Sequence, residues 1–184
     1  MKSIYLKNPR GVFYRQSGAA LAVVLVLLLV MTLLGTAVLR NTLLDERMSG
    51  NLYDRNLAFQ AAEAGLREAE GIVQDMHDAT GDAASAFPAA GCSKGLCARP
   101  TGLDTDRWRD DDFADWHKAT VLLAKNDAPP EYIVESMGEA PAWRLCDREI
   151  PRHPQCMKQR FRITALNEAA GRAQVMLQTN YSVK

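Results

Sequence analysis

Charge is missing from the longest apolar stretch of this chain, and proline is missing from a much longer one. The 21 residues from Ala19 to Leu39 contain no charged side chain, and no proline occurs between Pro9 and Pro88. Nothing in this interval therefore forces a helix to stop or kink. An apolar run of about 20 residues is long enough to cross the hydrocarbon core of a bilayer as a helix. We predict a membrane-spanning helix over residues 19–39.

The leader, residues 1–18, has no acidic side chain. It carries four basic ones, Lys2, Lys7, Arg10 and Arg15, which predicts that it stays in the cytoplasm while residues beyond 40 cross the membrane. A secretory signal has a shorter apolar region, about 7–15 residues, followed by a small-residue cleavage site. Here the glycine, Gly18, stands before the apolar run. Cleavage after Gly18 would leave the helix as the new N-terminus, and an uncut signal anchor is the alternative.

The sequence also lacks the motifs of catalysis and of nucleic-acid binding. It contains no glycine-rich phosphate loop, nucleophile elbow or cluster of metal-ligand residues, and its three histidines are dispersed. Without the leader, 18 basic residues face 22 acidic ones, and no basic stripe remains. We therefore predict no catalytic residue, no cofactor, no metal and no nucleic-acid partner, and a membrane-anchored periplasmic enzyme is the least favoured class.

The four cysteines, Cys92, Cys97, Cys146 and Cys156, all follow the predicted membrane span. In an oxidising compartment beyond the membrane, two disulfides are expected. Three connectivities are possible, and sequence proximity favours Cys92 with Cys97 and Cys146 with Cys156. A zinc site is the alternative, but these spacings lack the close C-x2-C pair of zinc knuckles.

Aspartate is concentrated between residues 104 and 115. The residues are Asp104, Asp106, Asp110, Asp111, Asp112 and Asp115. A calcium loop of the EF-hand type also needs a turn glycine and a closing glutamate, and this stretch has neither. We expect Asp110–Asp112 to cap a short helix that runs towards Leu123, where acidic groups suit the positive end of the helix. Calcium binding stays the alternative.

A one-sided apolar pattern continues the membrane run. The stripe consists of Leu44, Met48, Leu52, Arg55, Phe59, Ala62, Leu66, Ala69, Val73 and Met76. Steps of three or four residues place it on one face of an amphipathic helix over residues 40–78, which we expect to lean on a domain. A continuous helix from Ala19 to Met76 would be about 87 Å long. Gly35 and Gly50 each cost about 1 kcal/mol relative to alanine, and a break near Gly50 is the alternative.

The C-terminal part alternates apolar and polar residues, as strands with one buried face do. The predicted strands are Tyr132–Val134, Arg160–Leu166 and Gln174–Val183, with a hairpin connection over Asn167–Gly171. An antiparallel sheet of three or four strands on the amphipathic helix would bury both apolar surfaces. The predicted fold class is α+β, with a globular head over residues 79–184.

These features together resemble the type IV pilin family, and most closely the PilX-type minor pilins. The residues that carry the resemblance are Gln16–Leu21, Glu46–Leu52, Asp54–Ala64, Gly95–Cys97, the Trp108 and Trp116 pair, Tyr132–Glu135 and Arg160–Ala165. The match is specific over about the first 65 residues and weaker over the head. It implies a pilin-like fold, in which a long N-terminal helix packs on an antiparallel sheet.

The resemblance also implies a series of processing and assembly steps. A prepilin peptidase would cut after Gly18 and methylate the new amine of Ala19. The subunit would wait in the inner membrane with its head in the periplasm, and an assembly platform would then insert it into a pilus on the cell surface. The implied partners are other minor and major pilins and a large tip adhesin, with roles in priming assembly, cell adhesion and twitching motility.

Two residues depart from the family pattern. Most pilins have Phe first and Glu fifth after the cleavage point, and this chain has Ala19 and Val23. The fifth-position glutamate pairs with the terminal amine of the subunit above, because a carboxylate in hydrocarbon is expensive unless paired. Val23 has no such need, which predicts a subunit that starts a filament at or near its tip. The rivals are a minor pseudopilin of a type II secretion system and a single-pass membrane-anchored periplasmic protein.

Overall fold

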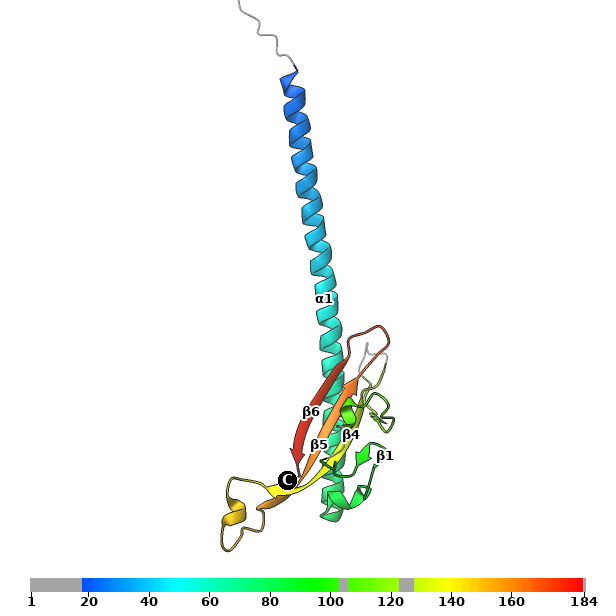
Figure 1. Ribbon diagram of the computed structural model, residues 1–184, viewed down its shortest axis with the longest axis vertical. Helices are drawn as coiled ribbons and strands as arrows, with labels where there is room; N and C mark the ends of the chain where they lie inside the picture. Colours follow the sequence, from blue (N-terminus) through cyan, green and yellow to red (C-terminus); the bar gives the residue numbers. More distant parts are fainter. Residues whose placement is uncertain (1–17, 103–105, 123–127, 184) are drawn as a thin grey trace, which may run out of the picture. The chain divides into compact units, whose positions relative to one another are not determined.

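The computed structural model describes residues 18–102, 106–122 and 128–183. The chain divides into two compact units, Met1–Met48 and Ser49–Lys184. One helix, α1 (Ala19–Thr80), passes from the first into the second (Figure 1). It runs through both Gly35 and Gly50, so the alternative of a helix break near Gly50 is wrong. The helix ends two residues beyond the predicted 40–78 segment.

The face of α1 that packs against the head consists mostly of small side chains. The buried positions of the helix are Ala58, Ala61, Ala62, Gly65, Leu66, Ala69 and Val73. The predicted stripe is correct from Ala62 onward, but its earlier members are solvent-exposed. Leu52 and Phe59 are 58% and 48% exposed, although the head already contacts the helix at Asp54, whose Oδ1 lies 2.9 Å from Arg172 Nη2. The expectation that the whole stripe leans on the domain is therefore wrong for its first half.

The head contains one six-stranded sheet. Its strands are β1 (Cys92–Ser93), β2 (Leu96–Cys97), β3 (His117–Lys118), β4 (Glu131–Pro141), β5 (Met157–Asn167) and β6 (Val175–Ser182). Their order is β1-β2-β4-β5-β6, and β3 also pairs with β4. The three long strands β4, β5 and β6 are antiparallel, as predicted. The short β2 runs parallel to β4, so the sheet is mixed.

Strand β4 is much longer than the predicted Tyr132–Val134. It spans 11 residues and contains a register shift between Ser136 and Gly138, where glycine adopts a φ of +78°. A bulge accommodates one extra residue in one strand of a pair, so that the pairing can continue beyond it. The polar residues after Val134 hid the continuation from the sequence pattern.

The main core lies between α1 and the sheet. Phe161, Ile163 and Ala165 of β5 are fully buried on this face, as their alternation predicted. Phe87 stacks on Phe161 with ring centroids 5.2 Å apart. It follows the short 3-10 helix η1 (Ala83–Ala86). The C-terminal end of the helix and the segment after it therefore pack against the same strand.

The opposite face of the sheet is buried as well, which corrects the expectation of one buried face. Ile133, Glu135 and Thr164 are fully buried there. The 3-10 helix η2 (Arg107–Arg109) sends Arg107 to Glu135 on this face. The segment around η2 thus contributes to a second layer.

The short helix predicted from Asp110 to Leu123 is absent from residues 110–122, and Leu123 itself lies outside the described residues. Strand β3 takes its place, pairing His117 with Tyr132, and the Ala119 N–H donates to the Pro130 carbonyl at 2.8 Å. Pairing with β4 therefore uses the backbone groups that a helix would have needed, and tertiary structure overrides the local capping signal.

Candidate processing and assembly site

Gly18 forms the junction before α1. Its φ is +51°, in the left-handed region that glycine adopts without strain. Its carbonyl accepts the first helical hydrogen bonds, from Leu21 N–H at 3.2 Å and Ala22 N–H at 3.4 Å. The Gly18–Ala19 peptide bond therefore lies at the boundary between non-helical and helical backbone, and both residues are exposed. The rest of the predicted leader, residues 1–17, lies outside the described residues.

The first 21 residues of α1 present an apolar surface in every direction. All residues from 19 to 39 are exposed, and Val23 is 57% exposed. The most apolar 18-residue window has a mean hydropathy of 2.8, so α1 is long and apolar enough to cross a membrane by length and composition. A bare surface of this kind is stable only in lipid or against other apolar surfaces.

The hydroxyl groups in this stretch are satisfied inside the helix. Thr32 donates to the Leu29 carbonyl at 2.8 Å, and Thr36 donates to the Leu33 carbonyl at 2.9 Å. A threonine hydroxyl that bonds its own helix needs no partner from the surroundings. The segment therefore meets the requirement that polar groups in hydrocarbon be paired internally.

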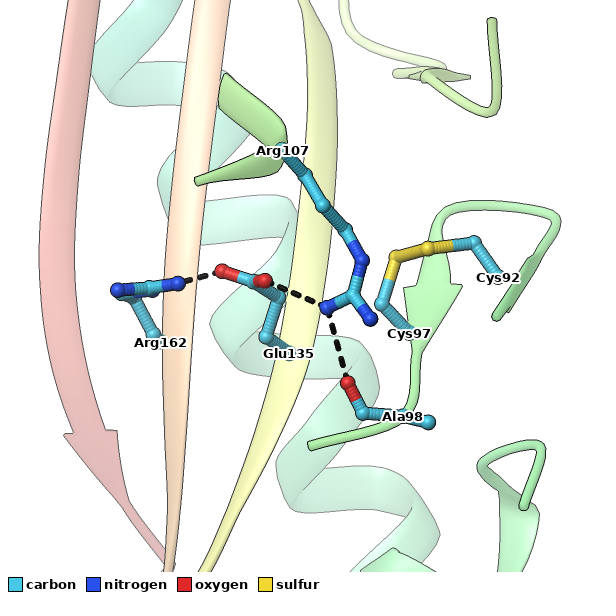
Figure 2. The surroundings of a disulfide bond; sticks show 6 residues. All are labelled: Cys92, Cys97, Ala98, Arg107, Glu135 and Arg162. Atoms are coloured by element: carbon cyan, nitrogen blue, oxygen red, sulfur yellow. Dashed lines mark hydrogen bonds and ion pairs between the residues drawn. A yellow bond between two sulfur atoms is a disulfide. The ribbon is translucent and has the colours of Figure 1, made fainter. Parts of the chain in front are cut away.

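A buried carboxylate joins three separate segments of the head. Figure 2 shows Glu135 of β4 between two guanidinium groups. Arg107 Nη1 donates to Glu135 Oε1 at 2.7 Å, and Arg162 Nε donates to Oε2 at 2.6 Å. The Glu135 side chain is fully buried. Its hydrogen bond is the main cause that raises the pKa of Arg162, and the three side chains form a buried ion-pair network.

The same network includes the first disulfide hairpin. Arg107 Nη1 also donates to the Ala98 carbonyl at 2.9 Å. Cys97 pairs in register with Glu135 and is bonded to Cys92 (Figure 2). Because β2 has only two residues, the disulfide and the arginine together hold it at the edge of β4.

The second disulfide closes the connection between β4 and β5. Cys146, which begins the 3-10 helix η3 (Cys146–Arg148), is bonded to Cys156. Both pairs are those that sequence proximity favours. Between the cysteines the chain is exposed, and Ile150 is 98% exposed. The bond therefore constrains a polar loop that the core itself does not hold.

Glu68 of α1 fixes the segment that follows β3. Its carboxylate accepts the Thr120 N–H at 2.9 Å, the Thr120 hydroxyl at 2.9 Å and the Val121 N–H at 3.1 Å. Burial, and secondarily the charge of Glu68, raise the pKa of Tyr132 to about 12. The sequence reasoning missed both Glu68 and Glu135.

The aspartates of the 104–115 stretch do not gather into a metal centre within the described residues. No group of three or more His, Cys, Asp or Glu side chains there could hold an ion. Asp106 lies 3.6 Å from Arg162 Nη1, and Asp110 accepts the Asp112 N–H at 3.1 Å. Asp104 lies outside the described residues. The calcium alternative thus gains no support from the part of the stretch that the structure places.

Comparison with known proteins gives one match. Residues 17–67 match the family described as PilX N-terminal. The matched range begins beside Gly18, covers the whole exposed apolar stretch of α1 and ends within its head-covered part. No curated protein and no solved structure matches the chain.

Proposed function

We propose that this chain, whose residues 17–67 match the PilX N-terminal family, acts as a minor pilin of a type IV pilus that is cut after Gly18 and built into the filament. One observation supports this above the others. Gly18 stands at an exposed helix start, directly before 21 uncharged residues that are all exposed, and the family match covers this junction. Cutting there removes the basic leader and leaves the helix intact.

The new N-terminus would be Ala19, methylated on its amine by the same prepilin peptidase. Before assembly the helix crosses the inner membrane once, with the head in the periplasm, because the basic leader favours the cytoplasmic side. After assembly the same apolar surface packs against the helices of neighbouring subunits in the pilus. The PilX family is one of structural pilins, and we infer no catalytic activity for the chain.

Val23 sets the position that we propose within the filament. A glutamate at this place would need the amine of a subunit above it, because an unpaired carboxylate in an apolar environment is costly. Val23 needs no partner above, while the Ala19 amine stays available to the glutamate of the next subunit. The chain is therefore suited to the tip, where it would prime assembly with other minor pilins and a large adhesin.

Mass spectrometry of the N-terminus tests the processing step. We expect a chain that begins with methylated Ala19 both in membranes and in sheared pili. The variant Gly18→Leu should keep its leader and stay in the membrane, whereas Gly50→Leu, at an exposed glycine within the helix, should be processed normally. An intact leader in the unmodified protein, or cleavage near Ala37, would instead identify an anchor or a secreted domain.

The variant Val23→Glu tests the tip position. We expect this substitution to reduce priming or to move the subunit from the tip into the shaft, because the new carboxylate would seek an amine above it. Unchanged piliation together with unchanged tip location would contradict the proposal. Val24→Glu carries the same charge one position away and controls for a general effect on membrane insertion.

A deletion strain separates the pilus role from that of a secretion pseudopilin. Pseudopilins of type II systems share the leader and the helix, and their tip member also lacks the glutamate. We expect the deletion to abolish surface pili, and with them adhesion and twitching, while protein secretion stays intact. Loss of secretion with normal pili would assign the chain to the secretion system.

A further inference from the structure

Strand β6 differs from the two other long strands of the sheet, β4 and β5, in having no charged side chain. Strands β4 and β5 carry three charged side chains each, which are Glu131, Glu135 and Glu139 in β4 and Lys158, Arg160 and Arg162 in β5. The eight residues of β6 include no charged residue, no proline and no glycine. Its register with β5 runs without a bulge from Val175 to Ser182.

Among the described residues, no strand pairs with the other side of β6, which ends the strand order. Proteins ordinarily protect such an edge with charges, prolines or bulges, because its free backbone groups invite another strand. None of these devices occurs in β6. An unprotected edge of this length is the kind of surface to which an extended peptide adds as a further strand.

The register identifies the backbone groups that are free. The Val183 N–H donates to the Gln159 carbonyl, so the odd-numbered residues of β6 direct their backbone groups towards β5. Gln178 lies opposite Thr164, and their side chains bond at 2.8 Å, as expected for a pair without backbone bonds. The N–H and C=O groups that point away from β5 therefore belong to Met176, Gln178, Asn180 and Ser182.

The side chains along this edge indicate what kind of strand fits. A cavity of about 260 Å³ is lined by Trp108, Met176, Leu177 and Gln178. The Trp108 Nε1 is buried and has no hydrogen-bond acceptor among the described residues. Met176 is 38% exposed. An added strand with an apolar side chain beside Met176 would fill this space, and a charged one would lose its hydration without gaining a partner.

We propose that the β6 edge binds an extended, uncharged segment of another pilus protein, which continues the sheet as its next strand. The edge is read from the structure, and only the source of the segment rests on the proposed function. A second copy of this chain is a poorer occupant. Two β6 strands related by a twofold axis run antiparallel, whereas chains anchored in one membrane or stacked in one filament run the same way.

Hydrogen exchange on the full chain in detergent micelles tests the proposal. The probe is an eight-residue peptide, blocked at both ends, that alternates threonine and valine. At saturating peptide we expect the amides of Met176, Gln178, Asn180 and Ser182 to exchange about tenfold more slowly or better, because they become hydrogen-bonded. The amides of Leu177, Thr179 and Tyr181 already bond to β5 and should not change.

Two blocking variants and their controls sharpen the test. Asn180→Pro removes one outward N–H at a place where edge strands tolerate proline, and Asn180→Thr removes the same side chain but keeps the N–H. Met176→Lys adds an edge charge, and Ala170→Lys adds the same charge in the exposed turn before β6. We expect peptide protection to be lost in Asn180→Pro and Met176→Lys, and to be kept in both controls.

Three outcomes would overturn the proposal. The first is unchanged exchange with the peptide in the unmodified chain. The second is equal protection in the blocking variants and their controls. The third is protection of the even-numbered amides that rises with protein concentration in the absence of peptide, which would assign the edge to a second copy. None of these results depends on cleavage at Gly18 or on pilus formation, so the two proposals fail separately.

Discussion

The two halves of α1 differ in how far their side chains are buried, and hydrophobicity alone does not explain the difference. The first half is built of large apolar side chains such as Leu28, and every one described between residues 19 and 39 is exposed. The second half contributes mostly alanines to the core, and Ala61, Ala62 and Ala69 are fully buried. The more hydrophobic half is thus the one that its own chain leaves uncovered. Small side chains let a sheet approach a helix closely, whereas the large side chains of the first half stay exposed.

All three tryptophans, Trp108, Trp116 and Trp143, lie in the unit Ser49–Lys184. Their fluorescence during denaturant unfolding of the full chain in detergent therefore reports on the head that covers the second half of α1.

The largest loss is expected from Glu135→Leu. Removing this carboxylate leaves Arg107 and Arg162 close together without their shared partner. Breaking a buried ion pair in this way costs about 3–5 kcal/mol of unfolding free energy. Glu135→Gln keeps a hydrogen-bond acceptor and should lose less. A change below about 1 kcal/mol in Glu135→Leu would show that the network does not hold the head together.

The next largest loss is expected from replacing both Cys146 and Cys156 with serine. The bond spans 10 positions of a loop whose residues are otherwise exposed, and releasing it should cost about 2–3 kcal/mol in the chain-entropy model. Replacing Cys92 and Cys97 opens a shorter loop and should cost less. Periplasmic levels of the protein provide a second measurement. If neither stability nor level falls, the Cys146–Cys156 bond is not a structural bridge.

Gly65→Leu places a large apolar side chain, of the kind found in the first half of α1, on the buried face of its second half. A Cβ at Gly65 would lie 3.2 Å from Pro130 Cβ and 3.6 Å from Ala165 Cβ, whereas at Gly50 it would meet nothing within 4 Å. We expect Gly65→Leu to lower the unfolding free energy by about 1–3 kcal/mol through overpacking. Gly50→Leu should be neutral or stabilise by up to about 1 kcal/mol through helix propensity. Equal effects at the two positions would contradict the close approach.

The smallest effect on the head is expected from Leu28→Ala in the uncovered half. Leu28 is 55% exposed, so truncating it should change the unfolding free energy of the head by no more than about 0.5 kcal/mol. Recovery of the variant in sheared pili, compared with its level in membranes, measures the effect on packing outside the chain. A clear loss of head stability would mean that the two halves are energetically coupled.

The sequence pattern predicted the parts of the fold that depend on neighbouring residues. The helix, the alternation in β5 and β6 and the position of Gly18 before the apolar run are all local signals. It missed Glu135 and Glu68, whose partners Arg107 and Thr120 lie 28 and 52 positions away. Glu135 directly follows the predicted strand Tyr132–Val134, and the available signal for it was Arg162 in the neighbouring predicted strand Arg160–Leu166. The capping signal at Asp110 failed because β3 was recruited by β4, which local propensity cannot foresee.

The hydroxyls of Thr32 and Thr36 are turned inward to the helix backbone, and this has a consequence for the transfer of the subunit between surroundings. A segment whose polar groups are all bonded within itself has no hydrogen bond to break when it leaves one medium and none to form when it enters the next. Lipid chains and the apolar side chains of other helices are then nearly equivalent solvents for it. In the proposed transfer from membrane to pilus, the hydroxyls of Thr32 and Thr36 would therefore neither favour nor oppose the exchange.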